Sequence, residues 1–305
     1  MIRLGLSVHD TILDPSPLRR RRILERIAAA GIGHVAVGDH ISFHDGTGFD
    51  GLISATTVLA THDELAVHLG VYLLGLRHPM LAARQLSTLA EIAPARLVLG
   101  VGVGGEDRSE ISNSGVDPAT RGRRLDETLA LVRALLDGEE VTHRGEFFEL
   151  DHARILPAPV PSIPIIVGGK GDAAIWRAAR YGEGWLGVFC SARRFGATRE
   201  QIMEAADSLG RKPDWFGINV WCGLDSDSAK ADDLLGRKMA ALYHLPRERF
   251  RNVAPAGTPE QVADWLRPFV AAGAGTLTLN VAAESVEAGI DHAAAVRELL
   301  CPADS

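Results

Sequence analysis

Short apolar runs alternate with amphipathic stretches along the whole chain. Within the amphipathic stretches, apolar side chains recur every three or four residues, so that Leu125, Leu129, Val132 and Leu136 share one helical face. The apolar runs show little polar alternation, which is typical of strands buried on both faces of a parallel sheet. We therefore predict strands at 2–8, 34–38, 65–76, 96–103, 165–167, 185–189, 216–222 and 276–281.

Helices are predicted between these strands, and several have recognisable start signals. Pro79 is a favourable first helical residue because proline lacks the N–H that would be unpaired there. Thr258 is a plausible N-cap, with Pro259 at the first helical position. The predicted helices lie at 17–30, 52–61, 79–93, 121–137, 172–181, 193–209, 228–243, 259–272 and 285–300.

Eight strand–helix units in strict alternation predict an α/β protein with a parallel sheet. A (β/α)8 TIM barrel is the economical arrangement, and a doubly wound open sheet is the alternative. The open sheet lacks support because His9, Asp10 and Thr11 follow the first strand in place of a glycine-rich dinucleotide fingerprint. We expect one domain over residues 1–305. An insertion at about 138–164 contains a hairpin turning at 144–145, and a segment at about 243–258 is irregular.

The stretch 69–105 predicts where a cofactor lies. It consists of a strand, a helix and a second strand, and glycines stand near the end of each strand: Gly70 in the first, and Gly102 and Gly104 after the second. Glycines at such positions let a ligand approach the backbone closely. In a barrel the functional residues lie at the carboxyl ends of the strands. A cofactor is therefore expected beside these glycines.

A second glycine cluster follows the predicted strand at 165–167. Gly168, Gly169, Lys170 and Gly171 leave backbone N–H groups free at the start of a helix, where the helix dipole favours an anion such as phosphate. Lys170 adds a positive charge. A tight turn that needs glycine only for its geometry explains the same residues equally well.

Asp39 and His40 place a carboxylate and an imidazole together at the end of the second strand. An imidazole titrates near neutrality and suits proton transfer, although a histidine held only by loop contacts is the simpler reading of the pair. Glu106, after the fourth strand, is a further candidate acid or base, or else the solvated start of the 106–120 loop. The spacing of His40 and His44 does not predict a metal site, because no third ligand is evident.

Composition narrows the possible partners. The net charge of −7 disfavours a nucleic-acid or membrane surface, and no apolar run approaches the roughly 20 residues that span a bilayer. Cys190, Cys222 and Cys301 are widely spaced, which predicts free thiols in a reducing compartment. The first residues are too polar for a signal peptide. A cytoplasmic enzyme acting on a small molecule is the expectation.

The order and spacing of several segments resemble the luciferase-like monooxygenase family, in particular its branch that uses the deazaflavin coenzyme F-420 (F420). The resemblance extends over nearly the whole chain and implies a (β/α)8 barrel with insertions. Members of this family often form dimers, so the resemblance also implies a homodimer. The segments that carry it are GVYLLGLRHP, LVLGVGVGG, GVDPATRGRRLDETLALVRALLDGE, ILPAPV, IPIIVGG and AARYGEGW.

The resemblance also implies roles for individual residues. Gly70 and Val71 match a bulge with a non-proline cis peptide that supports the flavin-like ring. Asp39 matches a residue that contacts this ring, and His40 matches an acid or base in related sugar-phosphate dehydrogenases. The glycine cluster at 168–171 matches the phosphate site of the cofactor. The chain is thus expected to transfer a hydride between coenzyme F-420 and a small organic substrate.

Two departures from those sugar-phosphate dehydrogenases leave alternatives open. His44 stands where they have tryptophan, and Gly105 stands where they have the glutamate, with Glu106 displaced by one position. A sugar phosphate is therefore not the expected substrate. An FMN-dependent monooxygenase on the same fold is the first alternative, and a cofactor-binding protein without turnover is the second.

Overall fold

The computed structural model describes residues 2–105 and 107–301. Within them, parallel strands close into a ring, since β11 pairs with β1 and β8 pairs with β9. The TIM-barrel prediction is confirmed, and the open sheet is excluded. In ring order the strands are β1 (Arg3–Ser7), β2 (His34–Val37), β3 (Ala66–Tyr72), β4 (Leu97–Val101), β7 (Ile165–Gly168), β8 (Gly184–Val188), β9 (Trp215–Leu224) and β11 (Thr276–Ala282).

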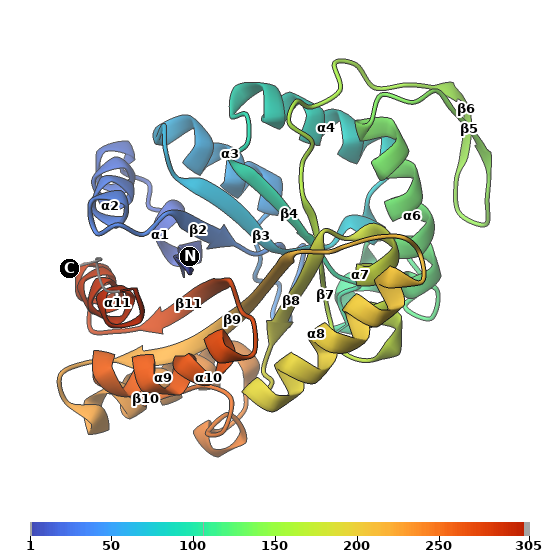
Figure 1. Cartoon of the computed structure of the whole chain (residues 1–305). Helices are drawn as coiled ribbons and strands as arrows, with labels where there is room; N and C mark the ends of the chain where they lie inside the picture. The colour runs from blue at the N-terminus through green and yellow to red at the C-terminus, as the bar shows by residue number, and fades with distance from the viewer. Residues whose placement is uncertain (1, 106, 302–305) are drawn as a thin grey trace.

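Helices surround the ring (Figure 1). Proline begins α2, α4 and α10, and the predicted N-cap role of Thr258 at α10 is confirmed. The structure adds a capping box between Thr258 and Gln261. The main helices are α2 (Pro17–Ala29), α3 (Gly51–Thr61), α4 (Pro79–Ile92), α6 (Arg121–Leu136), α7 (Asp172–Tyr181), α8 (Ala192–Asp207), α9 (Ser228–Tyr243), α10 (Pro259–Ala271) and α11 (Val286–Leu300).

The core lies between the strands and these helices. The predicted apolar face of α6 packs inward, where Leu125, Leu129, Val132 and Leu136 are all buried. Burying one such side chain stabilises the fold by about 1.5–3 kcal/mol. Among the residues that the structure describes, no helix is both long and apolar enough to cross a membrane.

The structure adds short elements to the predicted ones. The predicted hairpin is confirmed as β5 (Val141–Arg144) and β6 (Glu149–Ala153), which project beside α6 (Figure 1). The irregular segment contains η2 (Arg247–Arg249) and β10 (Ala256–Gly257), which pairs with β9. The sequence does not predict α1 (His9–Ile12), η1 (Leu74–Leu76) or α5 (Arg108–Asn113). Of these, α5 matters most for function, because it replaces part of an expected loop at the barrel mouth.

Candidate active site at the carboxyl ends of the barrel strands

Strand β3 is irregular where it reaches the mouth of the barrel. Its pairing with β4 shifts register between Leu69 and Tyr72, and the intervening Gly70–Val71 peptide bond is cis. The bulge and the cis bond confirm what the resemblance predicts for the geometry of this segment. Both residues are half-buried, so they form part of the surface at this end of the barrel.

Glycines on the neighbouring strands make room for this bulge. A Cβ atom on Gly102 would lie 2.6 Å from Val71 Cγ2, and one on Gly168 would lie 2.8 Å from Val71 Cγ1. A Cβ on Gly100 would lie 1.9 Å from the carbonyl oxygen of Leu69. These distances are too short for atoms that are not bonded to each other, so a side chain at any of the three glycines would clash with the bulged segment. Gly102 and Gly168 therefore have a packing role, which is to let the Val71 side chain lie against β4 and β7.

Asp39 lies below this surface and is fully engaged with the protein. Its carboxylate accepts hydrogen bonds from the backbone N–H of Gly51 and of Leu73, both at 2.9 Å. The Arg77 guanidinium donates to both oxygens, at 2.5 and 2.8 Å. The carboxylate has no exposed surface. Asp39 thus fixes the turn after β3, and its carboxylate has no exposed surface left for contact with a ring.

His40 pairs with a carboxylate that the sequence does not single out. Its Nδ1 lies 3.2 Å from both oxygens of Glu110 on α5. The backbone N–H groups of Ile41 and Ser42 also donate to Glu110, at 2.7 and 3.2 Å. A carboxylate acceptor requires a proton on Nδ1, so Nε2 is the basic nitrogen of the neutral ring.

The pair combines a buried anion with an accessible base. The Glu110 side chain is 2% exposed, whereas the His40 side chain is 41% exposed. Burial acts to raise the pKa of Glu110, but hydrogen bonds and charge from His40, together with the two backbone donors, lower it overall. Glu110 is therefore ionised at neutral pH and can stabilise a protonated His40. This arrangement suits general acid–base chemistry at the barrel mouth.

Aromatic rings connect His40 to the rim of the barrel. The Phe43 ring lies 4.3 Å from that of His40 and 4.0 Å from that of His44. The His44 backbone N–H donates to Asp107, which also caps α5. The His44 ring also stacks on the ring of His244, which directly follows α9, with 5.5 Å between the ring centroids. The segments around residues 44, 107 and 244 therefore meet over one side of the mouth.

The glycine cluster after β7 leads into α7 without a side-chain cap. Gly169 and Gly171 have φ angles of 118° and 83°, and Gly171 is the N-cap of α7. No side chain caps this helix, so the N–H groups of its first turn have no side-chain acceptor. Lys170 is exposed and lies 5.7 Å from the Phe189 ring. Asp172 in the first turn partly offsets the positive potential of this end.

Neither cysteine near the strand ends is an activated nucleophile. Burial raises the pKa of Cys190 to about 11, although the positive charges of Lys170 and Arg194 oppose this. Burial raises the pKa of Cys222 to about 12. Both thiols are therefore protonated at neutral pH. No group of three or more His, Cys, Asp or Glu side chains in the described ranges is arranged to hold a metal ion.

The structure brings most of the predicted site residues to one end of the barrel. The bulge, His40, Gly102, Gly104 and the 168–171 cluster all lie at or just after the carboxyl ends of strands. Glu106 lies outside the described residues, so its predicted role stays a prediction. Sequence reasoning missed Glu110, whose only local signal is an acidic residue on a short polar helix.

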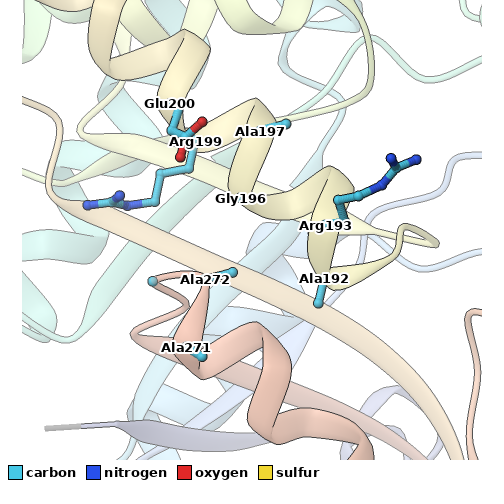
Figure 2. A pocket seen from close by; sticks show the side chains of 9 residues that line it. Ala192, Arg193, Gly196, Ala197, Arg199, Glu200, Ala271 and Ala272 are labelled. Carbon is cyan, nitrogen blue, oxygen red and sulfur yellow. The ribbon is translucent and has the colours of Figure 1, made fainter.

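An open hollow that is separate from the strand ends lies between α8 and the end of α10 (Figure 2). Its volume is about 490 Å³, and alanine and glycine provide most of its walls. Arg193 and Arg199 also line it, and their side chains extend in different directions from α8 (Figure 2). None of its lining residues is a strand-end candidate, so this hollow is not the predicted site.

A model of the family described as luciferase-like monooxygenase matches residues 5–276. An F420-dependent glucose-6-phosphate dehydrogenase from Nakamurella multipartita is 37% identical over 180 residues, which cover 56% of this chain and 52% of that protein. The chain spans about half the length of the first curated relatives it matches.

Solved structures share the fold. An F420-dependent secondary alcohol dehydrogenase, in complex with an F420–acetone adduct, superimposes with a TM-score of 0.85 at 20% identity, covering 98% of this chain and 99% of that one. The monooxygenase RslO1 from Streptomyces bottropensis gives 0.83 at 23% identity and 99% coverage of both chains. At these identities the likeness establishes the architecture alone.

Proposed function

The chain belongs to the luciferase-like monooxygenase family, and on this premise we propose that it is an oxidoreductase that uses the deazaflavin coenzyme F-420. The coenzyme would exchange a hydride with a small organic substrate at the carboxyl ends of the strands. Relatives named as F420-dependent dehydrogenases and a reductase support this choice. The observation that carries the proposal is the His40–Glu110 pair, because it places an accessible base at the same end of the barrel as the β3 bulge.

The residues at the mouth fit such a coenzyme. The half-buried Gly70–Val71 bulge offers a surface for one face of a ring, and the glycines that pack around Val71 hold this surface in place. The N–H groups after β7, with Lys170, suit the phosphate of the coenzyme. Gly104, with a φ of 65°, keeps the turn after β4 compact. When bound, the deazaflavin supplies the hydride acceptor or donor.

The protein supplies position and a proton partner. His40 Nε2 takes the proton that an alcohol-type substrate releases on oxidation, or returns it in the opposite direction. Ionised Glu110 holds the ring of His40 through Nδ1 and stabilises the imidazolium that forms. Asp39 and Arg77 act one layer below, by fixing the turn that follows the bulge.

Equilibrium titration tests the proposal directly. Purified protein is titrated with coenzyme F-420 and, in parallel, with FMN, and binding is followed by the change in cofactor fluorescence. We expect saturable binding of the deazaflavin and much weaker binding of FMN. Tight binding of FMN with none of the deazaflavin would overturn the assignment.

An FMN-dependent monooxygenase is the second candidate, because the family model that matches residues 5–276 is described as luciferase-like monooxygenase. Reduced FMN reacts with oxygen, whereas a reduced deazaflavin does so poorly. Oxygen consumption with reduced FMN therefore separates the two candidates. A single domain, a homodimer and a cytoplasmic location complete the proposal, and light scattering measures the oligomeric state.

A further inference from the structure

Polar side chains fill part of the barrel interior below the bulge. His34 and His68 stack with ring centroids 3.9 Å apart, and His34 Nε2 lies 2.9 Å from Thr278 Oγ1. Burial, aided by the charge of Arg3, lowers the pKa of His34 to about 3, and burial lowers that of His68 well below its ordinary value. Both imidazoles are therefore neutral and can each accept a hydrogen bond as well as donate one.

Three buried polar atoms in this region have no hydrogen-bond partner among the described protein atoms. They are His68 Nδ1, Trp215 Nε1 and Asn219 Oδ1. His68 is 7% exposed and Trp215 8% exposed, so neither group reaches solvent. An unpaired buried polar group costs about 1–3 kcal/mol, and most such groups in folded proteins are bonded to protein or to ordered water.

The same three residues line one small internal cavity. Gly70, Leu69 and Thr278 are among its other lining residues, so it lies on the barrel axis directly below the bulge. The volume within which the centre of a water molecule can move is about 10 Å³. A site of roughly this size with two to four polar partners holds a single water.

We propose that one fixed water molecule occupies this cavity and orients Asn219 as a hydrogen-bond donor toward the mouth of the barrel. The water accepts from Trp215 Nε1–H and donates its two protons to Asn219 Oδ1 and His68 Nδ1. Each of the three unpaired atoms thereby gains a partner, and the water makes the three bonds that buried waters usually make.

Asn219 connects the cavity to the proposed coenzyme site. Its Oδ1 is enclosed, but the residue as a whole is half-buried. Its Nδ2 would lie 3.3 Å from a Cβ atom on Gly70, so the amide N–H group stands against the bulge. This part of the inference rests on the proposed function, in which Asn219 donates to a polar edge of the bound ring and is a binding residue.

A crystal structure of the wild-type protein without coenzyme tests the water. We expect one ordered density peak about 2.7–3.2 Å from each of the three atoms. Direct pairing of the three side chains with one another would overturn the inference. So would the lack of a peak at a resolution that shows other buried waters. This outcome does not depend on whether the protein binds a deazaflavin.

Two substitutions test the orientation of Asn219 by deazaflavin titration. Asn219→Leu removes the donor and should raise the Kd about tenfold, the equivalent of one hydrogen bond. Trp215→Phe removes the N–H that anchors the water, together with part of the ring, and should raise the Kd less, with loss of the density peak. Trp265→Phe, a half-buried tryptophan on α10, is the matched control and should leave the Kd unchanged.

The outcomes separate the two proposals. If the wild type binds deazaflavin and Asn219→Leu binds it equally well, the donor role of Asn219 is wrong and the proposed function stands. If the wild type binds no deazaflavin, the proposed function and the donor role fail together, and the density alone decides the water. Circular dichroism shows whether each variant is folded. If Asn219→Leu does not fold, Asn219→Asp replaces it, because aspartate keeps the hydrogen-bond acceptor but loses the donor.

Discussion

Replacing Glu110 by glutamine is the sharpest test of the His40–Glu110 pair. Glutamine keeps the volume and can still accept from the N–H groups of Ile41 and Ser42, but it loses the negative charge that faces His40. A hydrogen bond to a charged group contributes about 1.5–3 kcal/mol. Because His40 is 41% exposed, solvent screens the pair, and we expect the lower end, about 1.5 kcal/mol at neutral pH.

The pH dependence identifies the charge as the cause. The pKa of Glu110 is lowered in the folded chain, so its stabilisation is fully present above the ordinary value of 4.5 and is lost as the pH falls through the lowered pKa. Glutamine does not titrate in this range. The difference in unfolding free energy between wild type and Glu110→Gln should therefore shrink as the pH falls below 4.5 and through the lowered pKa of Glu110.

Urea denaturation at a series of pH values measures this difference. Glu146→Gln is the control, because Glu146 forms an exposed pair with Arg123, and it should leave the stability unchanged at neutral pH. An equal loss of stability for Glu110→Gln at neutral and at acidic pH would refute the charge argument. The variant would then act through packing alone.

Three further substitutions test the surroundings of the site. Gly102→Ala places a Cβ 2.6 Å from Val71 Cγ2 and should destabilise the fold by about 1–3 kcal/mol in urea denaturation; unchanged stability would show that the bulge is free to move. Arg77→Met leaves the buried Asp39 carboxylate without its cation and should cost about 3–5 kcal/mol in the same assay, with Asp39→Asn in the same background restoring part of the loss. Lys170→Ala should raise the deazaflavin Kd about fivefold and leave the melting temperature unchanged, and an unchanged Kd would remove Lys170 from the phosphate site.

Much of the fold could be predicted because each local signal has one dominant physical cause. Apolar runs mark strands buried on both faces, and proline and threonine mark helix starts, so that the predicted start of α10 at Pro259 matches the observed one. The bulge at Gly70–Val71 followed from the resemblance and from no local pattern. The helix α5 was missed because its residues, RSEISN, carry one buried apolar side chain, Ile111, and no helical periodicity.

The site was harder to predict because its partners are distant in sequence. His40 and Glu110 are separated by 70 positions, and they meet because β2, β3 and β4 lie side by side in the sheet and end at the same edge. The polar interior was hidden for a different reason. His34 and His68 lie within runs that are otherwise apolar, and their environment depends on the opposite strands. Asp39 was expected to face a ring, but the later Arg77 and Leu73 enclose its carboxylate.

A crystal structure with bound coenzyme F-420 tests the central claim most directly. We predict that the ring lies over Gly70–Val71, with His40 Nε2 facing the side where substrate binds and the phosphate at the N–H groups of 169–171. Coenzyme bound elsewhere, for example in the hollow between α8 and α10, or a ring that does not face His40, would contradict the account.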